Sequence, residues 1–115
     1  MIKRKSEMNK TLKTNMRDGD GSVLVTDVLN KDEYKGKSRL VATLTIEPGC
    51  SIGTHVHENE EEIFYIISGT ATYNDNGKEE ILYAGDSCLC LSGEKHSIAN
   101  RHDDTLIVFA VILTY

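Results

Sequence analysis

Short apolar runs separated by turn residues fill the chain from Ser22 onward, and this pattern limits its fold more than any other feature. Between Arg39 and Ile46 apolar side chains recur with a period of two, as in a β-strand with one face toward a core. Similar runs follow at intervals of roughly 8–12 residues, without the apolar stripe of a helix. The expected strands span residues 22–28, 39–46, 61–67, 70–73, 78–83, 87–91, 96–100 and 106–113. This pattern predicts an all-β sandwich or barrel.

Turn residues set where the expected strands reverse direction. Glu47-Pro48-Gly49 ends one strand, and Asn74-Asp75-Asn76-Gly77 predicts a β-hairpin because Asn and Gly tolerate a positive φ. The last run, residues 106–113, is apolar at every position, so we expect both of its faces to be covered. One face would join the barrel core. The other would form an internal packing layer or a subunit interface, and we expect the interface of a homodimer.

The beginning of the chain has a different character. Residues 1–21 are polar, lack a clear period and end in the turn sequence Asp18-Gly19-Asp20-Gly21. Five Lys or Arg residues lie between Lys3 and Lys13, a cluster that we interpret as part of a solvated terminus. We therefore expect a polar N-terminal arm over residues 1–21 and a single β-barrel domain over residues 22–115.

Charge and composition argue against several classes of partner. The net charge of -5 does not predict a nucleic-acid surface, and no apolar run approaches the roughly 18–20 residues of a membrane-spanning helix. The three cysteines, Cys50, Cys88 and Cys90, form an odd set, and no secretory signal pattern precedes them. We expect a cytoplasmic protein without disulfides and without a membrane partner.

Three of the four histidines fall into two spaced patterns together with one glutamate. The first pattern contains Gly49, His55, His57, Glu62 and Gly69. The second contains Gly85, Leu91, Gly93, His96 and Asn100. Three imidazoles and one carboxylate are a suitable ligand set for a divalent transition metal.

The two patterns resemble the two sequence motifs of the cupin superfamily. The first fits at every fixed position, and the second departs only at Leu91, where the family usually has proline. The segments Glu61–Gly69 and Ala84–Asp86 are similar to cupins as well, and the resemblance covers about residues 22–113. It implies a double-stranded β-helix of the jelly-roll type, with His55, His57, Glu62 and His96 as ligands of a metal inside the barrel. Since proline would fix φ at residue 91, the departure concerns the turn before His96.

The residue types suit such a site independently of the resemblance. His55 and His57 lie two positions apart, so on a strand both side chains point to the same face. Phe64 and Ile66 share the face of Glu62 on the next strand and would form apolar walls. One carboxylate and three neutral imidazoles would leave an octahedral M²⁺ ion with two open positions. This set suits iron, manganese or nickel, and zinc is an alternative.

Further pocket candidates are less well defined. Cys88 and Cys90 share one face of their strand and could line the pocket, or could be small buried hydrophobic residues. We expect a structural hydrogen bond from Asn100. Arg39 and Arg17 could anchor an anionic ligand, because arginine pairs bidentately with carboxylates, or could lie on the surface.

Several polar residues near the patterns leave alternatives open. Tyr65, Tyr73 and Tyr83 could each offer a phenol to a ligand, and the pattern does not choose among them. Glu58, Glu60 and Glu61 are interpreted as a solvated acidic turn, and His102 as an exposed loop residue.

The resemblance favours a metal-dependent enzyme that acts on a small polar carboxylate, similar to oxalate decarboxylases or dioxygenases. The alternatives are a sugar- or uronate-processing isomerase and a non-catalytic cupin that binds or senses a small ligand. A small-molecule ligand is expected in each case. The motifs fix no residue that could act as a general base.

Overall fold

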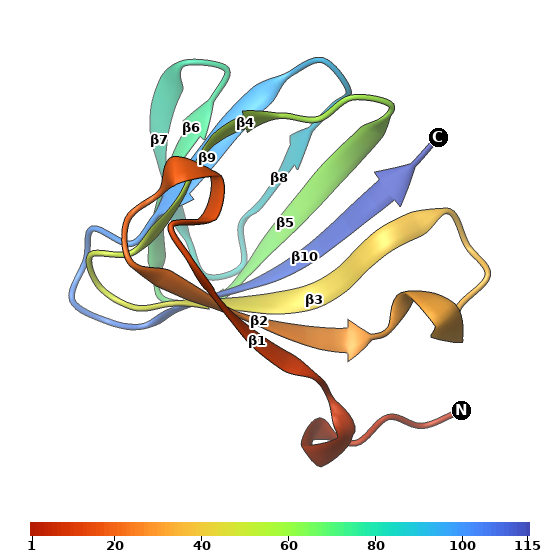
Figure 1. Cartoon of the computed structure of the whole chain (residues 1–115). Helices are drawn as coiled ribbons and strands as arrows, with labels where there is room; N and C mark the ends of the chain where they lie inside the picture. Colours follow the sequence, from red (N-terminus) through yellow and green to blue (C-terminus); the bar gives the residue numbers. More distant parts are fainter.

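Ten β-strands form two antiparallel sheets, shown in Figure 1 for a computed structural model that describes residues 1–115. The strands are β1 (Lys10–Thr14), β2 (Ser22–Leu29), β3 (Ser38–Ile46), β4 (Ser51–Val56), β5 (Glu60–Ser68), β6 (Thr70–Asp75), β7 (Lys78–Tyr83), β8 (Ser87–Cys90), β9 (Lys95–Ala99) and β10 (Leu106–Thr114). One sheet has the order β1-β2-β3-β10-β5-β8, and the other has the order β4-β9-β6-β7. This arrangement confirms the all-β fold that the strand pattern predicted and the double-stranded β-helix that the resemblance implied.

The remaining regular structure consists of three single turns of 3-10 helix. They are η1 (Lys5–Glu7), η2 (Met16–Asp18) and η3 (Lys31–Glu33). No helix is long and apolar enough to cross a membrane.

The core lies between the two sheets and follows the period of two. On β3 the residues Ala42, Leu44 and Ile46 are buried, and β10 buries every second residue from Leu106 to Ile112. All of these side chains except Ile112 belong to a cluster of 14 buried hydrophobic residues to which both sheets contribute. Each fully buried aliphatic or aromatic side chain contributes roughly 1.5–3 kcal/mol, so alternation on these strands specifies which face turns inward.

The other face of β10 is only half-buried, although it is also apolar. Phe109 lies opposite Tyr65 in the register with β5, and Val111 lies opposite Ile63. Tyr65 remains 46% exposed. The chain therefore does not itself cover the outer face of this sheet.

The hairpin between β6 and β7 forms at the predicted position. Asp75 pairs with Lys78, and the two residues between them, Asn76 and Gly77, have φ angles of 53° and 99°. Two successive positive φ angles are the requirement of a type I′ turn, which explains the Asn-Gly sequence.

The expected polar arm contains a strand that joins the sheet. β1 pairs with β2 over its whole length, from Lys10 opposite Thr26 to Thr14 opposite Ser22. All five residues of β1 are exposed, so its sequence carries no apolar alternation. It is held by backbone hydrogen bonds at the edge of the sheet, where lysines are common. After β1, η2 packs against β4 of the other sheet.

Candidate metal centre

The three motif histidines and Glu62 meet between the two sheets. His55 near the end of β4 lies directly opposite His96 of β9, and His57 follows β4 immediately. Glu62 comes from β5 of the six-stranded sheet. One potential ligand atom from each of the four residues lies within 4.8 Å of all the others. The fold thus assembles a group that the chain contributes in separate segments.

The distances within this group fit a single ion. Glu62 Oε1 lies 2.9 Å from His57 Nε2, 3.1 Å from His96 Nε2 and 3.9 Å from His55 Nε2. The Nε2 atom of His96 lies 3.1 Å from those of His55 and His57. Two donors bound at ~2.1 Å to one ion and about 90° apart lie ~3 Å from each other. The four side chains could therefore hold a divalent cation between them.

Each imidazole uses its other nitrogen in a separate hydrogen bond. His55 Nδ1 donates to the carbonyl oxygen of Gly53 at 2.8 Å, and His57 Nδ1 donates to Glu60 Oε2 at 2.6 Å. His96 Nδ1 lies 2.8 Å from the hydroxyl of Tyr73. In the neutral rings of His55 and His57 these bonds place the proton on Nδ1 and leave a lone pair on Nε2. Lone pairs and a carboxylate that face one another repel each other unless a cation lies between them. Hydrogen-bond partners of the other ring nitrogen orient metal-binding histidines.

Burial and hydrogen bonding set the charge states of the group without a metal. Burial alone would raise the pKa of Glu62, but the three histidines that face its carboxyl group hold that pKa well below its usual range. The hydrogen bond to Glu62 raises the pKa of His57, whereas burial lowers the pKa of His96. Glu62 is thus a carboxylate, and the lowered pKa of His96 favours the neutral imidazole that a metal needs.

A second carboxylate supports the centre from behind. The Arg39 guanidinium donates from Nε and Nη2 to the two oxygens of Glu60, each at 2.7 Å. This bidentate pair, together with the bond from His57, lowers the pKa of Glu60 to about 2. The interpretation of Glu60 as part of a solvated acidic turn is therefore wrong, because its carboxylate is mostly buried and joins His57 to Arg39.

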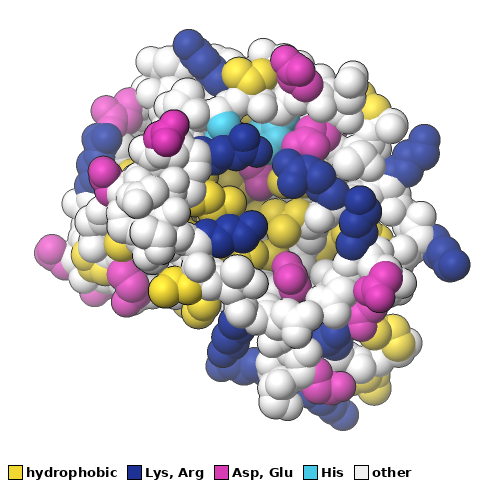
Figure 2. Space-filling model, in the orientation of Figure 1, with side chains coloured by type: hydrophobic (Ala, Val, Ile, Leu, Met, Phe, Trp, Pro, Cys, Tyr) yellow, Lys and Arg dark blue, Asp and Glu magenta, His cyan; other side chains and the backbone are white.

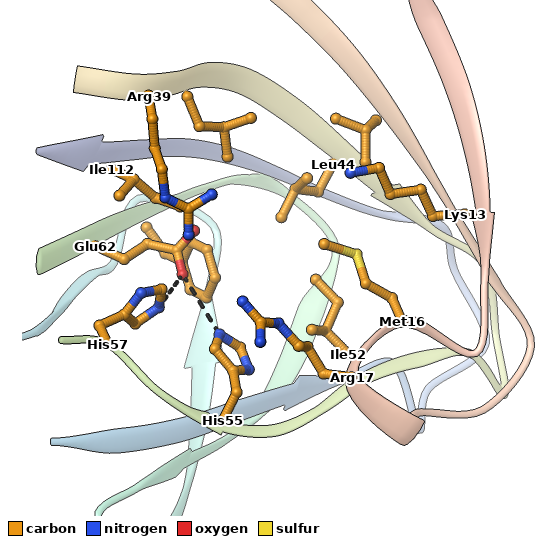
Figure 3. A pocket seen from close by; sticks show the side chains of 13 residues that line it. Lys13, Met16, Arg17, Arg39, Leu44, Ile52, His55, His57, Glu62 and Ile112 are labelled. Carbon is orange, nitrogen blue, oxygen red and sulfur yellow. Dashed lines mark hydrogen bonds and ion pairs between the residues drawn. The ribbon is translucent and has the colours of Figure 1, made fainter. Parts of the chain in front are cut away.

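The candidate ligands border a cavity of about 170 Å³. Val25, Leu44, Ile52, Phe64 and Ile112 form most of its apolar wall. Figure 2 shows the opening as a hollow with histidine and apolar side chains inside and Lys and Arg side chains around it. The close view in Figure 3 shows His55, His57 and Glu62 at one side of this cavity.

Among the other predicted pocket residues, Phe64 and Arg39 line the cavity. The Phe64 ring stacks on the imidazole of His96, with centroids 5.2 Å apart and planes 11° from parallel. It therefore limits the position of His96 as well as forming the wall.

The four other pocket candidates are not among the residues that line this cavity. Ile66 is fully buried in the core, and Asn100 donates to the carbonyl oxygens of Ile46 and Asp104. Burial raises the pKa of Cys88 to about 12 and that of Cys90 to about 11, so both are protonated thiols, and Cys88 packs against the hydrophobic core. Alternation alone shows which face of the sheet a residue joins, but not how far along the barrel the cavity extends.

The sequence reasoning missed two parts of the site. It left Tyr73 among three equivalent tyrosines, and only the fold brings its hydroxyl to His96. No sequence pattern indicated that Lys13 and Met16, which lie in the expected polar arm, line the cavity.

The turn before His96 closes without the proline that the motif usually has. The Leu91 N–H donates to Glu94 Oε1 at 2.7 Å, and the Glu94 N–H donates back to the Leu91 carbonyl at 3.1 Å. Gly93, with a φ of 86°, donates its N–H to the carbonyl of His57 at 2.7 Å. A side-chain hydrogen bond therefore stabilises this turn where proline would fix φ.

Two antiparallel sheets that enclose three histidines and a glutamate define the class of double-stranded β-helix proteins with a candidate metal centre. The family model described as the cupin domain matches residues 42–112. This protein belongs to the cupin family.

Comparisons with individual proteins agree with this assignment. The chain is 42% identical to a protein of Thermotoga maritima named oxalate-binding protein, over 98% of this chain and 93% of that one. A crystal structure described as a predicted oxalate decarboxylase from Thermotoga maritima is 42% identical, covers 100% of both chains and has a TM-score of 0.94. An uncharacterized protein with a double-stranded β-helix domain from Klebsiella pneumoniae is 28% identical, with 86% of this chain and 83% of that chain covered and a TM-score of 0.71.

Proposed function

We propose that this protein binds a divalent transition metal through His55, His57, Glu62 and His96 and uses the ion to bind a small carboxylate such as oxalate. One observation carries the proposal: the four donor atoms converge within 4.8 Å while the histidines use their Nδ1 atoms elsewhere. Iron, manganese and nickel suit this donor set because an octahedral ion would keep positions open for the carboxylate. Zinc is the alternative ion.

The cavity favours a ligand of few atoms. Its volume of about 170 Å³ is smaller than the roughly 300–1,000 Å³ of pockets that take drug-sized molecules. A carboxylate with one or two carbon atoms fits within this volume. The name of the oxalate-binding relative, which is 42% identical, supports oxalate as the first ligand to test.

The residues that line the cavity support binding more directly than turnover. A bound metal supplies Lewis acidity toward a carboxylate. The apolar wall, which includes Leu44, Phe64 and Ile112, excludes water from the ligand. Glu62 is the only carboxylate in the lining, and it belongs to the candidate centre, so no separate carboxylate is positioned as an acid or base.

An oxalate-decarboxylase-like or dioxygenase-like activity is the second candidate function. It is supported by the relative whose crystal structure is described as a predicted oxalate decarboxylase. Consumption of oxalate by the metal-loaded protein, with release of formate and carbon dioxide, would establish decarboxylation.

Calorimetric titration with oxalate tests the binding proposal. Protein loaded with Mn²⁺ is expected to bind oxalate, whereas the chelator-treated protein and a Glu62→Gln variant treated with the same ion bind it at least ~10-fold more weakly. Glu58→Gln changes the charge equally at an exposed position and is expected to match the unmodified protein. Equal oxalate binding with and without metal would contradict the proposal.

We also propose that the protein forms a homodimer through the outer face of β5, β8 and β10. Ile63 lies opposite Val111 on one side and opposite Leu89 on the other, so apolar side chains continue across the three strands. Leu89 is 46% exposed in the single chain. Light scattering on the unmodified protein should give twice the chain mass, and Leu89→Lys should give the monomer. A monomer in both cases would contradict this part of the proposal.

The state of the cysteines bears on the compartment. All three cysteines are free thiols in the structure. We propose the cytoplasm, because free thiols persist in a reducing environment.

A further inference from the structure

Two cationic side chains at the cavity have no acidic partner. Lys13 and Arg17 line the cavity, and neither forms an ion pair or a side-chain hydrogen bond with another residue. The other arginine of the lining, Arg39, is paired bidentately with Glu60. The arginine that the sequence suggested equally well as an anchor, Arg17, is thus the one that remains available.

The register of the edge strand turns Lys13 toward the cavity. Lys13 lies opposite Val23 in the pairing of β1 with β2, and residues directly opposite each other project to the same face. Val23 is fully buried on the inner face of the sheet. Lys13 therefore projects from the same face, and Figure 3 shows its side chain extending toward Leu44 at the edge of the cavity.

The turn that follows β1 brings Arg17 to the opposite part of the opening. Asn15, Arg17 and Asp18 have φ angles of 51°, 53° and 63°, so the backbone reverses within a few residues. Asparagine and aspartate tolerate this left-handed region, whereas arginine adopts it rarely. In Figure 3 the Arg17 guanidinium points into the cavity, toward His55 and Glu62.

This turn is fixed to the strand that carries His55. The Ser51 N–H donates to the Asp20 carbonyl at 2.9 Å, and the Asp20 N–H donates to Ser51 Oγ at 2.9 Å. A Cβ atom on Gly19 would lie 2.3 Å from the carbonyl oxygen of Ser51, and one on Gly53 would collide with the carbonyl of Arg17. The two glycines therefore let the N-terminal segment, residues 13–20, approach β4 backbone to backbone.

The charges of the cavity differ in sign from that of the whole protein. The chain has a net charge of -5, but Lys13 and Arg17 give the opening two uncompensated positive charges. Arg39 and Glu60 cancel each other. The charge of a divalent ion in the centre would exceed the single negative charge of Glu62 and leave the centre positive. Such a cavity favours anions, and arginine in particular binds carboxylates through two parallel hydrogen bonds.

We propose that Arg17, assisted by Lys13, binds the carboxylate oxygens of a short dicarboxylate that face away from the metal centre, and so determines specificity for a dianion. This inference rests on the proposed function, because it assumes that the metal centre holds one end of the ligand. The N-terminal segment, and not the metal motifs, then distinguishes dicarboxylates from monocarboxylates of the same length.

The test compares two ligands and two matched variants of the metal-loaded full chain. When the metal centre holds one carboxylate, oxalate presents a second carboxylate to Arg17, whereas glycolate presents only a hydroxyl. Arg17→Gln removes the proposed contact, and Arg101→Gln removes one positive charge from an exposed pair with Glu79. Metal content, measured for each variant, shows that the centre is still filled.

We expect Arg17→Gln to weaken oxalate binding roughly 10- to 100-fold and glycolate binding less than about threefold, because a hydrogen bond between two charged groups is lost only for oxalate. Arg101→Gln should change neither affinity, and Lys13→Gln should weaken oxalate binding less than Arg17→Gln. Equal oxalate affinities in Arg17→Gln and Arg101→Gln would overturn the inference while the proposed function stands. An equal loss for oxalate and glycolate would overturn it too. If the unmodified metal-loaded protein binds neither ligand, the proposed function itself fails.

Discussion

The metal centre and the N-terminal segment border the same cavity, but they are built in opposite ways. In the centre His57, Glu62 and His96 are at most 5% exposed, and each donor atom has a defined neighbour. In the segment Lys13 and Arg17 are exposed and lack a partner. A fully satisfied buried group is rigid and suits an ion, whereas an unpaired cation at an opening is available to a ligand. We therefore assign the binding of the ion and the binding of the outer end of the ligand to different parts of the chain.

The largest effect should follow removal of the buried carboxylate from the centre. Glu62→Gln is expected to weaken metal binding by more than ~100-fold. The loss of a residue that only hydrogen-bonds to a metal ligand already lowers metal affinity roughly 10- to 100-fold. Competition with a chelator of known affinity measures this change. His102→Ala removes a histidine outside the group and should leave the metal affinity unchanged. If both variants bind metal like the unmodified protein, Glu62 is no ligand.

A somewhat smaller effect should follow a change behind the centre. Glu60→Gln weakens the acceptor of the His57 Nδ1–H bond and leaves Arg39 without its partner. Metal affinity is expected to fall roughly 10- to 100-fold. The matched control is Glu58→Gln, an exposed position two residues earlier. Equal affinities of the two variants would show that Glu60 does not orient His57.

A steric change in the N-terminal segment should affect oxalate binding rather than metal binding. Gly19→Ala places a Cβ atom 2.3 Å from the Ser51 carbonyl oxygen, so the segment must move away from β4. We expect a loss of about 1–3 kcal/mol in stability and weaker oxalate binding, with metal affinity unchanged. Urea unfolding and calorimetry measure the two effects. Gly36→Ala, where nothing lies within 4 Å, is the control. A loss of metal binding in Gly19→Ala would mean that the metal centre depends on the position of the N-terminal segment.

The smallest effect is a dependence of stability on pH in the metal-free protein. The pKa of Glu60 falls from 4.5 to about 2 on folding, so its contribution is present above pH 4.5 and is lost as the pH falls toward 2. Because Arg39 is 39% exposed, solvent screening reduces this contribution to about 1 kcal/mol. Urea unfolding should find Glu60→Gln less stable than the unmodified protein at pH 6, with a smaller difference at pH 3. A constant difference would argue against a charged Glu60 in the native state.

The barrel and the members of the centre could be predicted because both follow from local patterns. Alternation on β3 specifies an inner face, and the spacing of His55 and His57 puts two imidazoles on one face of a strand. Glu62 and His96, in contrast, were expected as members of the centre from the resemblance to the two cupin motifs and not from strand geometry.

The rest of the site depends on tertiary contacts that leave no local pattern. β1 joins the sheet through its backbone, so its exposed side chains do not alternate. Glu60 stands in an acidic run, and only its contact with Arg39 separates it from its neighbours. Because Glu60 pairs with Arg39, only Arg17 is left to bind an anionic ligand. The spacing of these residues in the sequence does not reveal this difference.

The most direct test of this account is the metal content of the untagged protein, purified without chelator and without added metal and measured by elemental mass spectrometry. We expect about one iron, manganese, nickel or zinc ion per chain, in a centre that Glu62→Gln empties. The absence of bound metal, even after the protein has been incubated with each ion in turn, would contradict the account.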